Sequence, residues 1–188
     1  MDQRANILRI ARRKYREWGM NGFSFRDIAH DAGIKSSSVH YYFPTKEDLC
    51  LALVLAEFAY LEQALDQIER DHADTHAKLN AFFDLFIPSA DFIMPLPVVM
   101  VSEWAMLDDR TRTKLSEFMD IFDLWLGKTI RYGKISGDVR DDIIPEIAAA
   151  DIMAVLLGSC LLVKASGDYS YFKLQKQRLV HELLPINR

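Results

Sequence analysis

The sequence predicts an all-α protein. Apolar residues recur at three- and four-residue intervals along most of the chain, and no segment shows the strict alternation of a half-buried strand. Glycines, prolines and capping residues divide these helical segments. The chain has 188 residues, of which 50% are hydrophobic and 27% charged. This is enough apolar material for one compact domain, or for a small module joined to a moderate one.

Composition argues against secretion and membrane insertion. The longest charge-free stretches, Phe92–Ser102 and Ile152–Val163, are shorter than the roughly 18 to 20 residues that span a bilayer. The basic first segment lacks the apolar core of a signal peptide. Two cysteines, Cys50 and Cys160, are too few for a disulfide scaffold or a zinc site. We therefore expect a reduced, cytoplasmic protein with no membrane partner, no metal and no cofactor.

Positive charge is concentrated at one end of the chain. Residues 1–46 hold nine basic and four acidic side chains, a net charge of +5, whereas residues 47–188 carry a net charge of −9. The nine basic residues are Arg4, Arg9, Arg12, Arg13, Lys14, Arg16, Arg26, Lys35 and Lys46. A basic segment on an acidic remainder is expected if that segment meets a polyanion. The alternative is a solvated helix face, so the charge needs a motif beside it.

The first segment predicts a helix followed by a turn. Its apolar side chains share one helical face, and the arginines occupy the other. The apolar residues are Ile7, Ile10, Ala11, Tyr15 and Trp18. Gly19 ends this helix, and Asn21-Gly22 predicts a turn that needs a positive φ.

Two short helices follow with the spacing of a helix-turn-helix, over about residues 24–43. Ser24 and Asp27 match a capping box, and the helix that they begin stops at Gly33, where a Cβ would be strained. A second helix ends before Phe43-Pro44 and presents short polar or aromatic donors outward. They are Ser36, Ser37, Ser38, His40 and Tyr41. Side chains of this size reach base edges and phosphates in a major groove.

The rest of the chain also has a helical period. The predicted helices cover about residues 46–70, 75–87, 98–107, 111–132, 145–165 and 169–184. Pro88, Pro95 and Pro97 mark an irregular stretch, and Gly133–Asp142 is expected to be a turn-rich connection.

Residues 25–49, FRDIAHDAGIKSSSVHYYFPTKEDL, closely resemble the DNA-binding head of the TetR family of bacterial transcriptional regulators. The matching groups are Ile28-Ala29, Ala32-Gly33-Ile34, Val39-His40-Tyr41-Tyr42-Phe43 and Lys46-Glu47-Asp48-Leu49. The match covers roughly the first 50 residues. The remainder is similar to the family in length, helical pattern and acidic balance. The resemblance implies a DNA-binding domain over residues 1–48 and a helical ligand-binding and dimerisation domain over residues 49–188.

The resemblance also implies roles for individual residues in binding a double-stranded DNA operator. Ser24 and Arg26 fall where the family touches phosphate and sometimes a base. The base- and phosphate-contacting positions of the recognition helix are occupied by Ser36, Ser37, Ser38 and His40, and those of backbone contacts by Tyr41 and Tyr42. Lys46 begins the long helix, where a cation and free N–H groups both face a phosphate. The sequence departs from the family at Lys35 and Ser37, where Ser and Gly are usual, and at His40, where Tyr is usual.

Several of these positions have a second interpretation. Tyr42 and Phe43 can pack the head, and the three serines can form a capped, solvated turn. His40 is expected to be a neutral hydrogen-bonding side chain. The group of Arg4, Arg9, Arg12 and Arg13 is expected to form a long-range electrostatic face with one or two direct phosphate contacts.

A homodimer is expected because the operators of such proteins are usually palindromic. Two heads on one face of B-DNA must sit about 34 Å apart, or a multiple of that spacing. The helices over residues 111–132 and 145–165 suit a four-helix interface, with Trp125 on the first and Ala150, Ala154 and Gly158 on the second. The alternative is that these residues form intramolecular core.

Aromatic and methionine side chains in the middle of the chain predict an adaptable pocket for a small apolar effector. The predicted lining is Phe82, Phe83, Phe86, Met100, Glu103, Trp104, Phe118 and Phe122. The alternative is ordinary core. Asp84 and Glu103 either pair with a cationic ligand or face water. The resemblance implies that the effector favours a conformer whose heads no longer match the operator, with the helix from Lys46 carrying the movement.

The sequence gives less support to functions other than a regulator. The sequence has no nucleophile elbow, phosphate-cradling loop or supported catalytic pair, so an enzyme is not expected. The nearest approach to a metal cluster, Asp71, His72, Asp74 and His76, is better read as a solvated linker. A thiol-based redox sensor would use Cys50, since Cys160 lies in an apolar helix. Whether the regulator represses or activates transcription is left open, with repression as the first interpretation.

Overall fold

A computed structural model describes residues 2–86 and 94–183, and these residues contain helices and no strand. The chain divides into two compact units. The N-terminal unit comprises residues 1–60 and 93–118, and the C-terminal unit comprises residues 61–92 and 119–188. Two long helices, α4 (Lys46–Asp71) and α7 (Asp109–Ser136), contribute residues to both units.

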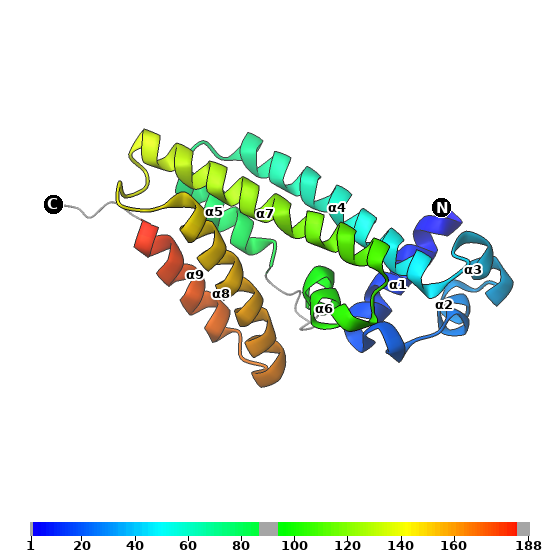
Figure 1. Cartoon of the computed structure of the whole chain (residues 1–188). Helices are drawn as coiled ribbons and strands as arrows, with labels where there is room; N and C mark the ends of the chain where they lie inside the picture. The colour runs from blue at the N-terminus through cyan, green and yellow to red at the C-terminus, as the bar shows by residue number, and fades with distance from the viewer. Residues whose placement is uncertain (1, 87–93, 184–188) are drawn as a thin grey trace. The chain divides into compact units, whose positions relative to one another are not determined.

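Short helices build the N-terminal unit together with the first part of α4 and of α7. They are α1 (Gln3–Trp18), η1 (Met20–Gly22), α2 (Phe25–Ala32), α3 (Ser36–Tyr42), α6 (Leu96–Ser102) and η2 (Trp104–Met106). In this unit α1 packs against α2 and α6, and α2 packs against α3 (Figure 1). Their buried faces supply one apolar core, which includes Ile7, Tyr15, Ile28, Val39 and Leu49.

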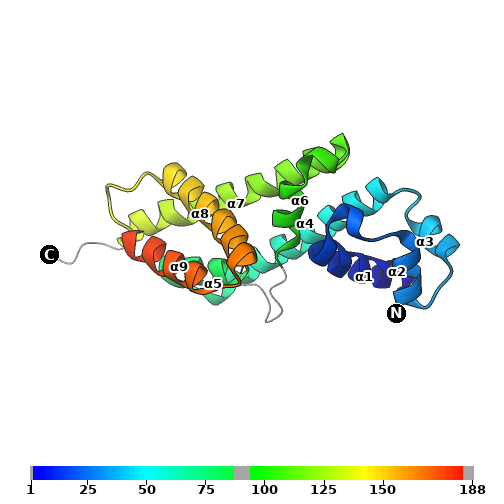
Figure 2. The same ribbon diagram turned by 90° about the horizontal axis from the view of Figure 1, so that it is seen from below.

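The C-terminal unit adds α5 (Thr75–Asp84), α8 (Pro145–Ser166) and α9 (Ser170–Leu183) to the remaining parts of α4 and α7. Here α9 packs against both α8 and α5, and Figure 2 shows the three helices side by side. Aromatic rings fill its core: Phe82 lies 5.7 Å from Phe122 and 5.2 Å from Trp125, measured between ring centroids.

The all-α prediction is confirmed, and most predicted helices lie within a few residues of their observed bounds. The predicted helix over 98–107 is instead α6, which starts at Leu96 with Pro97 in its first turn, and η2, with a break at Glu103. The predicted turn at Gly133 is wrong, because α7 continues to Ser136. A Cβ on Gly133 would lie 2.6 Å from the Val139 side chain and 2.7 Å from the Thr75 side chain. This glycine therefore lets Val139 and Thr75 pack close to the backbone of α7. Pro88 and the predicted helix end at residue 87 lie outside the described residues.

α8 has an apolar surface that the described residues leave exposed. By length and composition alone this helix could cross a membrane, and only 39% of its most apolar window is buried. The core helix of a soluble protein passes the same test. The uncovered side includes Ile147, which is 57% exposed, and Leu161, which is 47% exposed. The two exposed residues therefore make part of the surface of α8 apolar.

Candidate nucleic-acid interface

The first helix of the predicted motif begins with a complete capping box. The Ser24 N–H donates to the Asp27 carboxylate at 2.7 Å, and the Asp27 N–H donates to the Ser24 hydroxyl. The hydrogen bond from the Ser24 hydroxyl lowers the pKa of Asp27, because it stabilises the charged carboxylate. This box satisfies backbone donors at the start of α2 and leaves the neighbouring Arg26 exposed.

Gly33 makes the turn between the two helices, as predicted. Its φ of 67° lies in the left-handed region, which favours glycine. The N–H of Ile34 then donates to the Ala29 carbonyl at 3.0 Å and closes the end of α2. Ile28 and Val39, one from each helix, are fully buried beneath the turn. The turn and this small core fix α3 against α2.

α3 presents polar and aromatic side chains to solvent on one side and Val39 to the core on the other. Ser37, His40 and Tyr41 are exposed, with Tyr41 at 81%, and Ser36, Ser38 and Tyr42 are half-buried. The Tyr41 and Tyr42 rings meet edge-on with centroids 5.2 Å apart. The His40 ring packs edge-on against Phe25 at 4.7 Å. The predicted recognition surface is thus a solvent-facing set of donors whose rings are held by neighbouring rings.

Lys46 is less free than predicted. Its ammonium donates to the Phe23 carbonyl at 2.5 Å and lies 4.4 Å from the centroid of the Phe23 ring. Partial burial lowers the pKa of Lys46. Thr45 and Asp48 form a second set of reciprocal capping bonds at the start of α4. The ammonium therefore holds the loop before α2, while the first turn of α4 is satisfied by its own cap.

Several members of the predicted arginine face have partners inside the N-terminal unit. Arg12 donates through both its Nε and its Nη2 to the buried Glu57 carboxylate on α4. Arg13 and Lys14 both pair with Asp31 on α2, at 3.1 Å and 2.9 Å. The guanidinium of Arg4 lies over the Phe43 ring. Arg12 thus holds α1 to α4 and is neutralised by Glu57, whereas Arg4 meets only a neutral ring, and Arg13 and Lys14 share one carboxylate.

The turn after α1 is tied to α6 by contacts that the sequence did not indicate. The Met20 N–H donates to the Glu103 carboxylate at 2.9 Å, and the Arg16 Nε–H donates to the Met94 carbonyl at 2.6 Å. Gly19, and not Asn21-Gly22, is the residue with positive φ, at 71°. Glycine is favoured there by its φ, and a Cβ on Gly19 would lie 2.1 Å from Glu103 Oε1, so the Glu103 carboxylate would have to move.

Comparison with known proteins now agrees with this geometry. The sequence profile described as "Bacterial regulatory proteins, tetR family" matches residues 7–53, the segment from α1 into α4. This match identifies residues 7–53 as a TetR-type DNA-binding head. Its α2–Gly33–α3 segment is the helix-turn-helix of that family.

Similarity to known regulators extends beyond the head. HTH-type transcriptional regulator Mb1846 of Mycobacterium bovis is 29% identical over 160 residues, covering 78% of this chain and 64% of that protein. HTH-type transcriptional repressor KstR2 of Rhodococcus jostii is 29% identical over 148 residues, covering 78% and 72%. This chain therefore spans less than two thirds of the length of Mb1846.

Solved structures show the same fold. A TetR-family regulator from Agrobacterium tumefaciens superposes with a TM-score of 0.90 at 24% identity, covering 97% of this chain and 98% of that chain. The reduced form of Escherichia coli NemR superposes with a TM-score of 0.88 at 17% identity, covering both chains fully. At these identities the likeness shows the TetR fold and not a shared ligand.

The predicted pocket lining is divided between the two units of the chain. Phe82, Phe83, Phe86 and Phe122 are buried in the C-terminal unit, where their rings pack on one another. Met100, Glu103, Trp104 and Phe118 belong to the N-terminal unit. Glu103 is occupied by the Met20 N–H, and Asp84 pairs with Lys176 at 2.6 Å. Both carboxylates thus already have a partner within the chain.

The predicted dimer residues also differ in their placement. Ala150 and Ala154 are exposed on α8, and a Cβ on Gly158 would meet nothing within 4 Å. Trp125 instead stacks on Phe82 with an interplanar angle of 15° and is 9% exposed. Trp125 therefore belongs to the core of its unit and has little surface left for a partner chain.

The redox alternative does not fit the burial of the thiols. Cys50 is 1% exposed, and burial raises the pKa of its thiol to about 12. Burial likewise raises the pKa of Cys160 to about 11. A thiol of this kind carries almost no thiolate at neutral pH and is a poor nucleophile. Within residues 2–86 and 94–183, no three His, Cys, Asp or Glu residues gather as metal ligands would.

Proposed function

We propose that the chain is a ligand-responsive transcriptional regulator that binds a palindromic DNA operator as a homodimer, and that a small, largely apolar molecule releases it. The observation that carries this proposal is α2–Gly33–α3, whose solvent side offers Arg26, Ser37, His40 and Tyr41. Guanidinium, hydroxyl, imidazole and phenol groups are donors to phosphates and base edges. The proposal assigns the chain no enzymatic activity and places it in the bacterial cytoplasm, on the nucleoid when bound to DNA.

The DNA contacts are proposed for residues 1–48, and the ligand and dimer contacts for residues 49–188. Within the head, the exposed residues are expected to contribute most, and the half-buried Ser36, Ser38 and Tyr42 less. Ser24 contributes through its position at the start of α2, because its hydroxyl already bonds to Asp27. Lys46 is expected to support DNA binding indirectly, because its ammonium donates to the Phe23 carbonyl and fixes the loop before α2.

Homodimerisation is supported by the uncovered face of α8. Ile147, Ala150, Ala154, Gly158 and Leu161 recur at intervals of three and four, so they form one stripe along the helix. Small side chains in the middle of the stripe permit two helices to approach closely. On α9, Tyr171 and Leu174 are also exposed. A second copy of the chain would cover such apolar surface with an identical surface, as in a two-fold symmetric interface.

Repression with release by a ligand is the proposed sign of control. The relative KstR2 is named a repressor, and the same sign is proposed for this chain. Release requires that the ligand bind a DNA-incompetent conformer more tightly than the DNA-bound one, since equal affinity for both shifts nothing.

The test is fluorescence anisotropy of the full chain on the DNA upstream of its own gene, over a series of salt concentrations. Arg26→Ala is expected to weaken binding roughly 10-fold and to lower the salt slope by about 1, because one phosphate contact is lost. Lys173→Ala on α9 removes an exposed cation from the C-terminal unit and serves as the matched control.

Site-selective binding that Arg26→Ala weakens and Lys173→Ala does not would support the proposal. Equal effects of the two variants would contradict it, because they would indicate a response to net charge alone. Binding indifferent to DNA sequence would contradict the operator. Activation of transcription by the bound dimer in a reconstituted assay would overturn repression while leaving DNA binding intact.

A further inference from the structure

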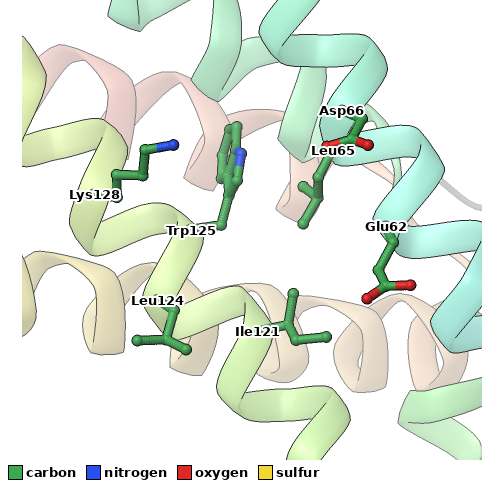
Figure 3. Close-up of a pocket in the computed structure, with 7 residues that line it drawn as sticks. All are labelled: Glu62, Leu65, Asp66, Ile121, Leu124, Trp125 and Lys128. Atoms are coloured by element: carbon green, nitrogen blue, oxygen red, sulfur yellow. The ribbon is translucent and has the colours of Figure 1, made fainter.

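An open groove of about 570 Å³ lies between α4 and α7 within the C-terminal unit. Figure 3 shows Leu65 and Trp125 facing each other across it, with Ile121 beside them. Glu62 and Asp66 line it from α4, and Lys128 lines it from α7. The groove therefore combines apolar side chains with charges of both signs. A volume of this size holds a small organic molecule.

The indole N–H of Trp125 is a buried hydrogen-bond donor beside this groove. Its ring stacks on Phe82, and the side chain is only 9% exposed. In the described part of the chain, its Nε1–H is buried and has no hydrogen-bond partner. Figure 3 shows the indole nitrogen on the side of the ring that faces Leu65 and Asp66. A buried indole N–H normally finds an acceptor, so this one calls for an acceptor atom supplied by an occupant of the groove.

The α4 wall of the groove is negative. Glu62 and Asp66 are four residues apart, so they share a face of the helix, and both are exposed. Among the residues that the structure describes, neither has a cationic side chain within ion-pair distance. The Lys128 ammonium on the other wall lies 6.0 Å from the Tyr132 ring centroid. Two neighbouring carboxylates favour a cation on the α4 side.

We propose that this groove is the effector site and that it binds a small organic cation. A protonated amine of the ligand lies against Glu62 and Asp66, a hydrogen-bond acceptor receives the Trp125 Nε1–H, and an apolar body lies between Leu65 and Ile121. The regulatory meaning of the site rests on the proposed function. The binding itself does not, because it is measurable on the protein without DNA.

Calorimetric titration with a matched set of probes tests the site. Phenoxypropylamine carries a cation, an ether acceptor and a ring. Phenoxypropanol and phenoxypropionic acid keep the body and change the charge, and phenylbutylamine replaces the ether oxygen with a methylene. The amine is expected to bind about 5-fold to 20-fold more tightly than the alcohol, from two partly exposed carboxylates, and the acid is expected to bind most weakly.

Variants assign this preference to the groove. Glu62→Gln with Asp66→Asn is expected to bring the amine to the affinity of the alcohol. The control, Asp120→Asn with Asp141→Asn, removes two exposed carboxylates of the same unit that do not line the groove. Trp125→Phe keeps a ring against Phe82 and removes the N–H. It is therefore expected to abolish the preference for phenoxypropylamine over phenylbutylamine, which is about 5-fold in the native chain.

The position of the probe is checked by fluorescence. Trp18 and Trp104 are 67% and 41% exposed, so Trp18→Phe with Trp104→Phe leaves Trp125 as the one tryptophan at little structural cost. The Trp125 emission is expected to shift when the amine binds. An unchanged spectrum at calorimetric saturation would place the amine elsewhere and overturn the site. Equal binding of amine, alcohol and acid would overturn the cation.

Fluorescence anisotropy of labelled operator DNA tests whether the amine regulates DNA binding. The amine is expected to release DNA from the native chain, and not from the Glu62→Gln, Asp66→Asn variant. Tight amine binding with no release would overturn the groove as the effector site. Absence of operator binding without any amine would count against the proposed function alone, and the calorimetry would still decide whether the groove takes a cation.

Discussion

The two units of the molecule differ in what they leave exposed. In the N-terminal unit the starts of α2 and α4 are capped and several cations are paired, and the exposed surface of α2 and α3 carries a small set of polar donors. In the C-terminal unit the exposed surface of α8 and α9 is apolar, with Leu174 at 63% and Ile147 at 57%. Exposed donors suit a polyanion, whereas an exposed apolar stripe suits a protein partner.

The comparison also shows why net charge is a weak guide to a contact surface. The N-terminal segment is strongly basic, but Arg12 and Lys14 are committed to Glu57 and Asp31. Arg26 remains exposed at the start of α2. Which cations meet DNA is therefore decided by long-range partners within the fold, and not by the number of basic residues.

The largest effect is expected from a charge on the α8 stripe. Ala154→Glu would place a carboxylate in the proposed interface, where its desolvation is unfavourable, so the chain is expected to become monomeric. Losing the second head would weaken operator binding by about 100-fold or more. Sedimentation velocity and DNA anisotropy measure the two effects. Ala59→Glu, at an exposed alanine of α4, is the control. A dimeric Ala154→Glu chain would refute the interface.

Gly19→Ala should destabilise the N-terminal unit by about 3 kcal/mol, because it adds backbone strain and meets the Glu103 carboxylate. Gly33→Ala is the comparison: Gly33 has φ 67° and ψ 33°, in the αL region, whereas Gly19 has ψ −177°, and a Cβ on Gly33 meets nothing within 4 Å, so about 1 kcal/mol is expected. Urea unfolding gives both values. Non-additivity of about 1 kcal/mol between Gly19→Ala and Glu103→Ala would identify the contact itself. Equal losses at Gly19 and Gly33 would speak against it.

Arg12→Ala is expected to cost about 2 kcal/mol of unfolding free energy, because it leaves the Glu57 carboxylate buried and unpaired. This loss of unfolding free energy is smaller than for a fully buried ion pair, because the Arg12 side chain is 41% exposed and water screens the interaction. Arg9→Ala, whose guanidinium bonds only to Asn6 among the described residues, should change stability by less than about 0.5 kcal/mol. A neutral Arg12→Ala would show that the pair contributes nothing to holding α1.

A smaller effect concerns acid stability. The Lys14 ammonium lowers the pKa of Asp31, so the folded state binds this proton less readily than the unfolded chain. The resulting stabilisation is present above the ordinary carboxylate pKa of about 4 and is lost as the pH falls through the lower folded-state value. Asp31→Asn should therefore reduce the fall in Tm between about pH 5 and pH 3. An unaltered slope, equal to that of Asp120→Asn, would contradict the linkage.

No effect at all is expected from thiol reagents on the native chain. Because burial raises the pKa of Cys50 to about 12, an aromatic disulfide reagent near pH 8 should titrate neither thiol until urea is added. Rapid native reaction at Cys50, with loss of DNA binding, would restore the redox alternative.

Much of the head was predictable because its signals are local. Ser24 with Asp27, and Gly33, act within a few residues of their partners, and each does in the structure what its spacing predicts. The contacts that sequence reasoning missed join distant segments. Glu103 reaches Met20 across 83 positions, and nothing near either residue in the sequence indicates the other.

The C-terminal unit was harder to predict for the same reason. Periodicity places Trp125 on an apolar face, but it does not tell whether that face meets its own chain or a second copy. Only the packing against Phe82 shows that Trp125 is core, with its N–H left over at a groove. Ala150 and Ala154 lie on one face of α8, as their spacing predicts. That they are exposed depends on how the other helices of the unit pack around α8, which the spacing does not indicate.

The most direct test of the central contrast is selection of binding sites from random-sequence DNA by the native chain and by the Ala154→Glu variant. The native chain is expected to enrich an inverted repeat whose half-sites are centred about one helical turn, or a multiple of it, apart. The variant should enrich at most a single half-site. No enrichment by the native chain, or the same inverted repeat selected by both, would contradict an account in which polar donors on α3 read DNA and the apolar α8 stripe pairs the heads.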